Sequence, residues 1–343
     1  MASSLLGTEL ALVQAPMAGS QGSALAVAVC NAGGLGSLPC AMLSPEAMDK
    51  ELAAIRAGTG RPFNVNFFCH RSSPADAARE AAWRSALRPY YEELGIDAAS
   101  IPAAPGRAPF SAEAAEVLER HKPAVVSFHF GLPSGELLAR VRRLGAKVLS
   151  SATTVEEARW LEAQGVDAII AQGLEAGGHR GMFLTDELTT QVGTLPLVSQ
   201  IVRAVKVPVI AAGGIAHAAD ARAALALGAA AVQVGTAYLL CPEATVSTVH
   251  RAALRSDTSR HTALTNLFTG RPARGIVNRL MRDLGPMSDL PPAFPLATAA
   301  IAPLRAAAEK KGQGDFSPLW SGQNVARDGM SAAEVTRDIA KGL

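Results

Sequence analysis

Residues 209–236, VIAAGGIAHAADARAALALGAAAVQVGT, decide the fold. The apolar run Val209–Ala212 predicts a buried strand, and the paired Gly213 and Gly214 predict a tight turn after it. The alanine-rich stretch 218–227 then predicts a helix that ends at a glycine. A second apolar run, Ala230–Val234, predicts the next strand. A strand–turn–helix–strand unit of this kind is typical of a parallel sheet with helices on both faces.

Working outward in both directions, we find the same unit repeated. Its strands are predicted at Leu12–Ala15, Gly34–Leu38, Phe63–Phe67, Ala124–Phe128, Lys147–Ser151, Ala168–Ala171, Val209–Ala212 and Ala230–Val234. Eight such units in roughly 240 residues match a closed (β/α)8 TIM barrel of the α/β class. An open doubly wound sheet is the alternative, and it is disfavoured because no GxGxxG motif follows the first strand.

Two segments lie outside the repeat. Residues 70–122 separate the third and fourth strands, and their pattern predicts two helices inserted beside the barrel mouth. Residues 242–343 contain helical stretches between Pro-rich turns and predict a helical cap packed on the barrel. The expected organisation is therefore a barrel of residues 1–241, with the insertion 70–122, followed by the extension 242–343.

Composition excludes several classes of protein. The net charge is +2, so nothing favours a nucleic-acid or acidic-membrane partner. Hydrophobic residues make up 49% of the chain, which is too many for a disordered protein. The four cysteines show neither a disulfide framework nor metal-type spacing. No signal peptide or spanning segment is recognisable, and the expected location is the cytoplasm.

The turns after the last two strands carry the first candidate binding site. Gly213 and Gly214 would let the backbone approach a ligand closely, and the turn after the final strand comprises Gln233, Val234, Gly235 and Thr236. We expect both turns to lead into helix N-termini. Backbone N–H groups at such ends bind phosphate, so we predict a phosphate site here.

Two further strand ends carry polar side chains. After the sixth strand comes AQGLEAGGHRG (171–181), in which Gln172 offers an amide, Gly177 and Gly178 leave room for a flat ring, and His179 with the following Arg offsets negative charge.

After the fourth strand comes SFHFG (127–131). His129 lies there between phenylalanines, where an imidazole is expected to be neutral and able to accept a proton or hydrogen-bond an anion.

The first and third strands complete the expected site. Pro16, Met17 and Ala18 offer a small apolar backbone shelf, and Asn66 could recognise a ring edge with its amide. Cys69 and the His beside it have no further metal ligand at suitable spacing, so no metal site is predicted. A phosphate cradle, amides around a planar ring and one histidine together indicate flavin mononucleotide (FMN).

The chain resembles the nitronate monooxygenases, formerly called 2-nitropropane dioxygenases. The resemblance covers nearly the whole chain and rests on QAPMAG (14–19), NAGGLGS (31–37), FNVNFFCH (63–70), VSFHFGLP (126–133), AQGLEAGGHRG (171–181), AAGGI (211–215) and AVQVGTAYLLCPE (231–243). It implies an FMN-dependent TIM-barrel enzyme that oxidises alkyl nitronates with dioxygen to a carbonyl compound and nitrite. It also implies His129 as the catalytic residue and FMN contacts at Asn66, Gln172, Gly177, Gly214 and the Gln233–Thr236 turn, with the Pro16–Ala18 backbone near the ring. His179 is a possible contact to the substrate or the flavin.

The resemblance leaves some points open. Some members carry two tyrosines and a lysine over the pocket, where this chain has Phe294, Thr298 and Ala302, so a less polar roof is expected. The substrate could be propionate-3-nitronate or a simpler nitronate, and the protein a monomer or a homodimer. Alternative functions are an NADH-dependent flavin reductase acting on quinones or enoyl thioesters, and a non-catalytic FMN-binding protein.

Overall fold

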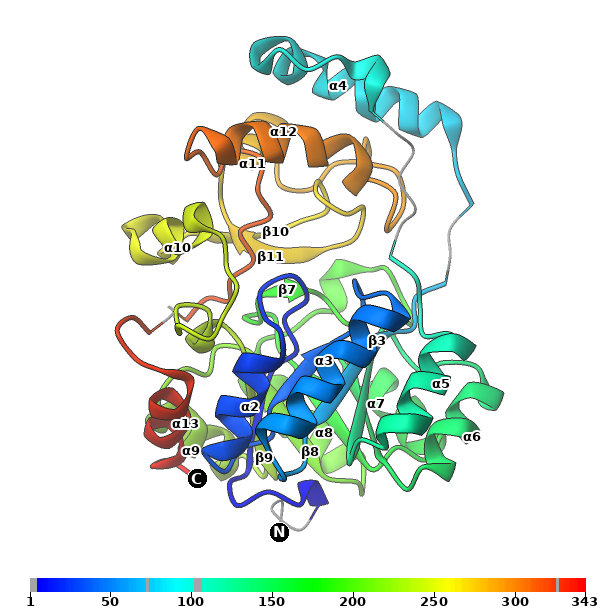
Figure 1. The fold of residues 1–343 in the computed structure, drawn as a ribbon, viewed down its shortest axis with the longest axis vertical. Coiled ribbons are helices and arrows are strands. Elements are labelled where there is room, and N and C mark those ends of the chain that lie inside the picture. Colours follow the sequence, from blue (N-terminus) through cyan, green and yellow to red (C-terminus); the bar gives the residue numbers. More distant parts are fainter. Residues whose placement is uncertain (1–4, 72–73, 102–106, 325–326) are drawn as a thin grey trace.

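The computed structural model describes residues 5–71, 74–101, 107–324 and 327–343, and a parallel sheet of eight strands forms its centre (Figure 1). The strand order is β1-β9-β8-β6-β5-β4-β3-β2. The sheet closes because Val13 of β1 bridges in parallel to Leu35, just before β2. Two backbone hydrogen bonds support this bridge, from Leu35 N to Leu12 O (2.8 Å) and from Gln14 N to Leu35 O (2.9 Å). The predicted barrel is confirmed.

All eight predicted strands are present, and their ends differ from the predicted ends by three residues at most. They are β1 (Leu12–Gln14), β2 (Ser37–Pro39), β3 (Asn64–Phe68), β4 (Val125–His129), β5 (Lys147–Ala152), β6 (Ala168–Gln172), β8 (Val209–Ala212) and β9 (Ala231–Val234). Their near-continuous burial follows from helices covering the outer face while side chains fill the lumen.

Eight helices form the outer ring in the described part of the chain. They are α2 (Ser23–Asn31), α3 (Pro45–Gly58), α5 (Ala112–His121), α6 (Gly135–Arg143), α7 (Val155–Ala163), α8 (Thr194–Ala204), α9 (Ala218–Ala226) and α13 (Ala332–Ala340). The sequence analysis expects α5 in the insertion and α13 in the cap. Both belong to the ring instead, because α5 packs against α3 and α6, and α13 packs against α9 and α2.

The remaining elements form a cap over one end of the barrel (Figure 1). In the cap, α4 (Ala77–Leu94) of the insertion packs against α12 (Thr298–Lys310). The cap also contains α10 (Thr248–Arg255), α11 (Arg279–Leu284), and the 3-10 turns η1 (Ala98–Ser100) and η4 (Asp257–Arg260). The C-terminus lies at the opposite end of the barrel. The cap faces the carboxyl ends of the strands, because Trp320 of the cap lines one cavity with His129 and Gln172 from the ends of β4 and β6.

The sequence analysis predicts a helical cap, but the cap also contains strands. Strands β10 (Thr262–Thr265) and β11 (Ala273–Ile276) form an antiparallel ribbon. The ribbon continues onto β7 (Gly178–His179), a short strand in the loop after β6. This pairing attaches the cap directly to the loop that carries His179.

The barrel interior changes character along its axis. Near the amino ends of the strands, the lumen holds apolar side chains, among them Val125, Leu149 and Ile210. Above them lies a polar layer, in which Asn64 Nδ2 donates to Ser37 Oγ (3.0 Å) and to Ser127 Oγ (2.9 Å). Asn64 therefore serves the interior, as its place on the strand allows. Among the described helices, none has both the length and the apolar character needed to cross a bilayer.

Candidate functional site

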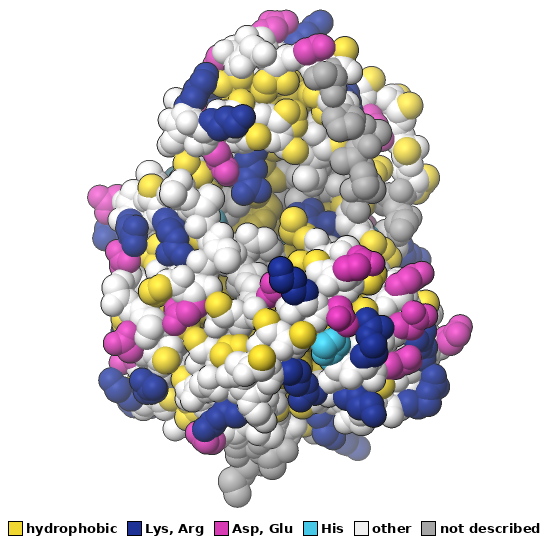
Figure 2. Space-filling view, in the orientation of Figure 1, with side chains coloured by type: hydrophobic (Ala, Val, Ile, Leu, Met, Phe, Trp, Pro, Cys, Tyr) yellow, Lys and Arg dark blue, Asp and Glu magenta, His cyan; other side chains and the backbone are white. Residues whose placement is uncertain are grey.

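A cavity lies where the carboxyl ends of the strands meet the cap. Figure 2 shows a hollow between cap and barrel, with hydrophobic side chains inside it and basic side chains near it. The cavity holds about 1280 Å³ of space free of atoms, part of it open to solvent. Its lining includes Pro16, Met17, Ala18, Asn66, His129, Gln172, Gly177, Gly178, His179, Gly213, Gly214, Gln233, Gly235 and Thr236. Of the predicted site residues only Val234 is absent, because its buried side chain points toward the helices.

The turn after β8 packs so closely against the loop after β6 and the start of α8 that it has no room for side chains. Gly213 and Gly214 have φ values of +118° and +68°, in the region that favours glycine. A Cβ on Gly213 would lie 2.8 Å from Thr194 Oγ1, and one on Gly214 would lie 3.3 Å from Glu175 Cβ. The backbone is therefore left bare at the cavity wall, which suits a bulky anionic group such as a phosphate.

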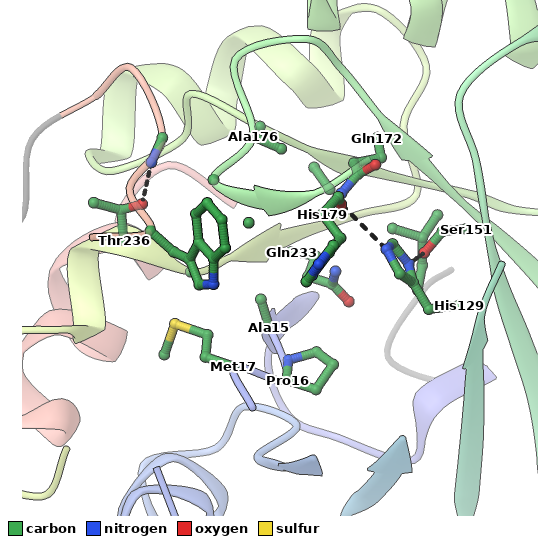
Figure 3. A pocket seen from close by; sticks show the side chains of 18 of the residues that line it. Ala15, Pro16, Met17, His129, Ser151, Gln172, Ala176, His179, Gln233 and Thr236 are labelled. Atoms are coloured by element: carbon green, nitrogen blue, oxygen red, sulfur yellow. Dashed lines mark hydrogen bonds between the residues drawn. The ribbon is translucent and has the colours of Figure 1, made fainter. Parts of the chain in front are cut away.

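The two turns do not lead into equivalent elements. The turn after β8 leads into α9, as predicted. The turn after β9 leads only into the 3-10 turn η3 (Thr236–Tyr238), because the chain then leaves the barrel to build the cap. The expectation of a second helix N-terminus is therefore wrong. Thr236 Oγ1 instead accepts a hydrogen bond from Gly322 N (2.9 Å), which fixes the irregular cap segment around Gly322 along the cavity (Figure 3).

Two glutamines present amides in this cavity (Figure 3). Gln172 is fixed, since its Nε2 donates to His179 O (2.9 Å) and its Oε1 accepts from Gly181 N (2.7 Å). Gln233 Oε1 is buried and has no hydrogen-bond partner among the described residues. A buried acceptor without a donor is costly, so a ligand N–H group, such as the imide of a flavin ring, would satisfy it.

His129 is held by hydrogen bonds on both ring nitrogens. Nδ1 lies 3.1 Å from Ser151 Oγ and Nε2 lies 3.2 Å from His179 O. A carbonyl oxygen only accepts, so Nε2 carries the proton and Nδ1 accepts from the serine hydroxyl. Loss of water around the ring lowers the pKa of His129 to about 4. The imidazole is therefore neutral at pH 7, as the sequence predicts.

His179 lies between the barrel and the cap. Its Nε2 is 2.9 Å from Thr269 Oγ1, and its ring contacts Phe68, Phe294 and Trp320 at centroid distances of 5.3–6.0 Å. Burial lowers its pKa well below the usual range for histidine. This imidazole is neutral too, and it faces the same space as Gln233 (Figure 3).

Arginines at and near the cavity give the site a positive environment. Arg107 lines it, and Arg180 and Arg271 lie close enough to His129 to lower the pKa of that residue further. Loss of water around the side chains lowers the pKa of these three arginines and of Arg274. Within the described chain, no carboxylate oxygen lies within 4.0 Å of any of their nitrogens. Arg180, for example, donates hydrogen bonds to the carbonyl oxygens of Gly173 and Gln172 (2.7 Å each). Such an environment favours anionic ligands.

The roof of the cavity differs from the expected one. Phe294, Thr298 and Ala302 do not line it, and Arg107 does. The Arg107 guanidinium lies 5.9 Å from the centre of the Phe294 ring and 3.5 Å from Thr298 Oγ1. The roof is therefore more polar than the sequence analysis expects, because a cation from the inserted segment reaches over these residues.

Sequence reasoning missed several residues that line the cavity, chiefly Arg107, Ser151 and Trp320. Ser151 stands near the carboxyl end of β5 and could have been found by the rule that located His129. Arg107 and Trp320 come from the insertion and the cap, where neither a repeat nor a motif marks them.

Comparison with known proteins gives a consistent result. A family model described as nitronate monooxygenase matches residues 1–342. The chain is 44% identical to a nitronate monooxygenase of Paraburkholderia phytofirmans, over 99% of this chain and 93% of that protein. It is 41% identical to one of Pseudomonas aeruginosa, over 99% and 97%. A nitroalkane oxidase structure from Streptomyces ansochromogenes superposes with a TM-score of 0.89 at 40% identity, covering 98% of this chain and 96% of that one.

Proposed function

Because this chain belongs to the nitronate monooxygenase family, we propose that it binds FMN and oxidises alkyl nitronates with dioxygen to a carbonyl compound and nitrite. One observation carries the proposal. A bare glycine turn, an unsatisfied amide oxygen and a neutral histidine line a single cavity. Figure 3 places Thr236 and His129 on opposite sides of it, with Gln233 and His179 between them.

The residues present fit a flavin. Gly213 and Gly214, with the Gly235–Thr236 turn, would hold the phosphate of FMN, and Gln233 Oε1 would accept from the ring. The Pro16–Ala18 backbone would support one face of the ring. Bound FMN would supply the redox chemistry that links oxidation of the nitronate to reduction of dioxygen. A single phosphate cradle without a dinucleotide fingerprint favours FMN over a dinucleotide flavin.

The protein supplies orientation and a suitable environment. A nitronate is an anion, and Arg107 in the cavity wall with Arg180 and Arg271 near His129 would favour its entry over that of a neutral molecule. His129 is neutral with a proton on Nε2, and it would donate a hydrogen bond to a nitronate oxygen when that oxygen replaces His179 O as the acceptor. His179 O would keep its hydrogen bond from Gln172 Nε2. Phe68 and Trp320 line the cavity and would exclude water. Propionate-3-nitronate and simple alkyl nitronates are the candidate substrates.

The test combines a spectrum with two assays. Purified protein should show a flavin absorption band, mass spectrometry of the released cofactor should give FMN, and ethyl nitronate in air should yield nitrite. Rapid bleaching of the flavin by NADH without oxygen, together with no nitrite, would instead show a flavin reductase. Bound flavin without either reaction would show a non-catalytic flavin-binding protein.

A further inference from the structure

A short segment of the cap, residues 320–324, forms one wall of the cavity, and we call it the strap. Its alternate residues Trp320, Gly322 and Asn324 line the cavity, and the two residues between them do not. Such an alternation is typical of an extended chain. At the start of the strap, Trp320 forms an antiparallel bridge to Gly275 of β11. One wall of the cavity therefore comes from the cap and not from a strand end of the barrel.

The backbone of the strap is bonded to two of the loops around the cavity. Gly322 N donates to Thr236 Oγ1, in the turn after β9 (2.9 Å; Figure 3). Gln323 N donates to Glu175 O, in the loop after β6 (2.9 Å). The fit there is close, because a Cβ on Gly177 would lie 2.5 Å from Gly322 N and one on Gly322 would lie 2.8 Å from Glu175 O. The strap and the loop after β6 therefore hold each other in place.

A third turn is held by a side chain of the strap. Asn324 Nδ2 donates to Gly214 O, in the turn after β8, and to the Asp220 carboxylate (3.0 Å each). The same carboxylate accepts from the backbone N–H groups of Ala216 and His217, just before α9 (2.9 Å each). Both partners of Asn324 are acceptors, so the group that faces them has to be a donor. Asn324 thus ties the glycine turn to the start of α9.

These bonds concern the phosphate of FMN, because they hold the two turns that would bind it, after β8 and after β9. Backbone N–H groups bind a phosphate well only when several of them point at one place, and ordering them during binding costs affinity. We propose that the strap is part of the cofactor site, and that Asn324 is a positioning residue that holds the glycine turn in the conformation that binds the phosphate. This inference rests on the proposed binding of FMN and deepens it.

The experiment compares FMN with riboflavin, which has the same ring and side chain but lacks the phosphate. It starts from the FMN-loaded enzyme and from enzyme in which excess riboflavin has replaced the FMN. Dilution releases flavin, and the rise in flavin fluorescence gives the dissociation constant. In Asn324→Ala this constant should rise roughly 10- to 100-fold for FMN, because two hydrogen bonds that order the turn are lost. For riboflavin it should stay nearly unchanged.

A second variant tests the need for a donor. Asn324→Asp keeps the size of the side chain but places a carboxylate opposite Gly214 O and the Asp220 carboxylate. Acceptors that face each other cannot bond, and like charges repel. Asn324→Asp should therefore bind FMN more weakly than Asn324→Ala does, although it is the more conservative change in shape.

Asn31 offers matched controls, because its exposed carboxamide also donates to a glycine carbonyl oxygen, Gly58 O (3.2 Å), and does not line the cavity. Asn31→Ala and Asn31→Asp should bind both flavins as the wild-type protein does. The two controls remove the same chemical group as the Asn324 variants do, so they show what the loss of a carboxamide costs away from the cofactor site.

Three outcomes would overturn the proposal. An equal loss of affinity for FMN and riboflavin in Asn324→Ala would show that Asn324 supports the fold or the ring site. An unchanged affinity for FMN in Asn324→Ala would show that the turn needs no strap. Equal affinities in Asn324→Asp and Asn324→Ala would show that no donor is required. Failure of the wild-type protein to bind FMN would contradict the proposed function as well, whereas the other outcomes contradict only the role of the strap.

Discussion

At the scale of single residues, the chemistry depends on how His129 is held. Ser151 and the His179 carbonyl occupy its two ring nitrogens and fix one tautomer. Gly181 makes this arrangement possible, since a Cβ there would lie 2.8 Å from His129 Cε1. The imidazole is therefore placed by contacts from β5 and from the loop after β6, in addition to its own strand.

We predict that His129→Ala lowers kcat/KM for ethyl nitronate by about 10- to 100-fold and leaves FMN content unchanged, because hydrogen bonding to the anion is lost. Since the pKa of His129 is about 4, this side chain stays neutral from pH 8 to pH 5 and should add no titration to the kcat/KM profile in that range. Steady-state nitrite assays over this range check both points. The exposed His261→Ala is the control, and full activity in His129→Ala would remove this residue from the reaction.

A second prediction concerns the cradle. Gly214→Leu should release the flavin, because it forces a residue with a side chain into the left-handed region and brings its Cβ to 3.3 Å from Glu175 Cβ, which would shift the turn assigned to the phosphate. The ratio of flavin absorbance to protein absorbance measures the loss. Gly312→Leu is a matched control, since Gly312 has a similar φ of +71° and a Cβ there would meet nothing within 4 Å. A fully yellow Gly214→Leu protein would refute the placement of the phosphate.

The sequence predicted those site residues that stand at strand ends. In a barrel the carboxyl ends of the parallel strands meet at one site, so the strand positions alone are enough to place these residues. It therefore placed Asn66, His129 and Gln172 around one cavity. It could not place Arg107 or Trp320. Their positions depend on how the insertion and the cap fold back over the barrel, and no local pattern encodes that.

At the scale of elements, α10 brings a buried histidine to the cap. His250 is 7% exposed, its Nε2 lies 3.1 Å from Trp320 O, and burial lowers its pKa to about 4. The carbonyl accepts, so the neutral ring donates through Nε2. This bond fixes the backbone of Trp320, whose side chain lines the cavity.

The direction of this pKa shift predicts acid sensitivity. The unfolded chain binds a proton near pH 6.5 and the folded chain only near pH 4, so the contribution of His250 is present above pH 6.5 and is lost as the pH falls toward 4. Between pH 7 and pH 4.5 the free energy of unfolding should fall in both proteins. The fall should be about 2 kcal/mol smaller in His250→Gln, which keeps a donor, than in the wild-type protein. Urea unfolding at the two pH values tests this, with His261→Gln as control. An equal loss in His250→Gln and wild type would contradict it.

Short elements were the ones that sequence analysis missed. The barrel strands are continuous apolar runs between turns, and this pattern alone identifies them. By contrast, β10 and β11 are half-polar, with sequences TALT and ARGI. They are strands because they pair with each other and because β11 also pairs with β7. A pattern that depends on a distant partner cannot be recognised locally.

At the scale of the whole molecule, the barrel is completed by the far end of the chain. The cap segment between β9 and α13 is an excursion from the last βα unit, because α13 returns to the ring between α9 and α2. Tyr238 OH, directly after the cradle turn, lies 2.9 Å from Thr336 Oγ1 of α13. The predicted division at residue 241 could not reveal this. A helix joined to its strand through a long insertion looks, in sequence, like part of an appended domain.

This arrangement predicts that the C-terminal helix carries global stability. Ile339 is fully buried in the main core, so Ile339→Ala should lower the free energy of unfolding by about 2–5 kcal/mol and keep a single cooperative transition. Urea unfolding of the FMN-free protein measures this without contributions from the cofactor. Leu195→Ala, at a position 57% exposed, should change stability by less than about 0.5 kcal/mol. If α13 were only a peripheral attachment, Ile339→Ala would cost as little as the control, or would produce a separate early transition while the barrel stayed folded.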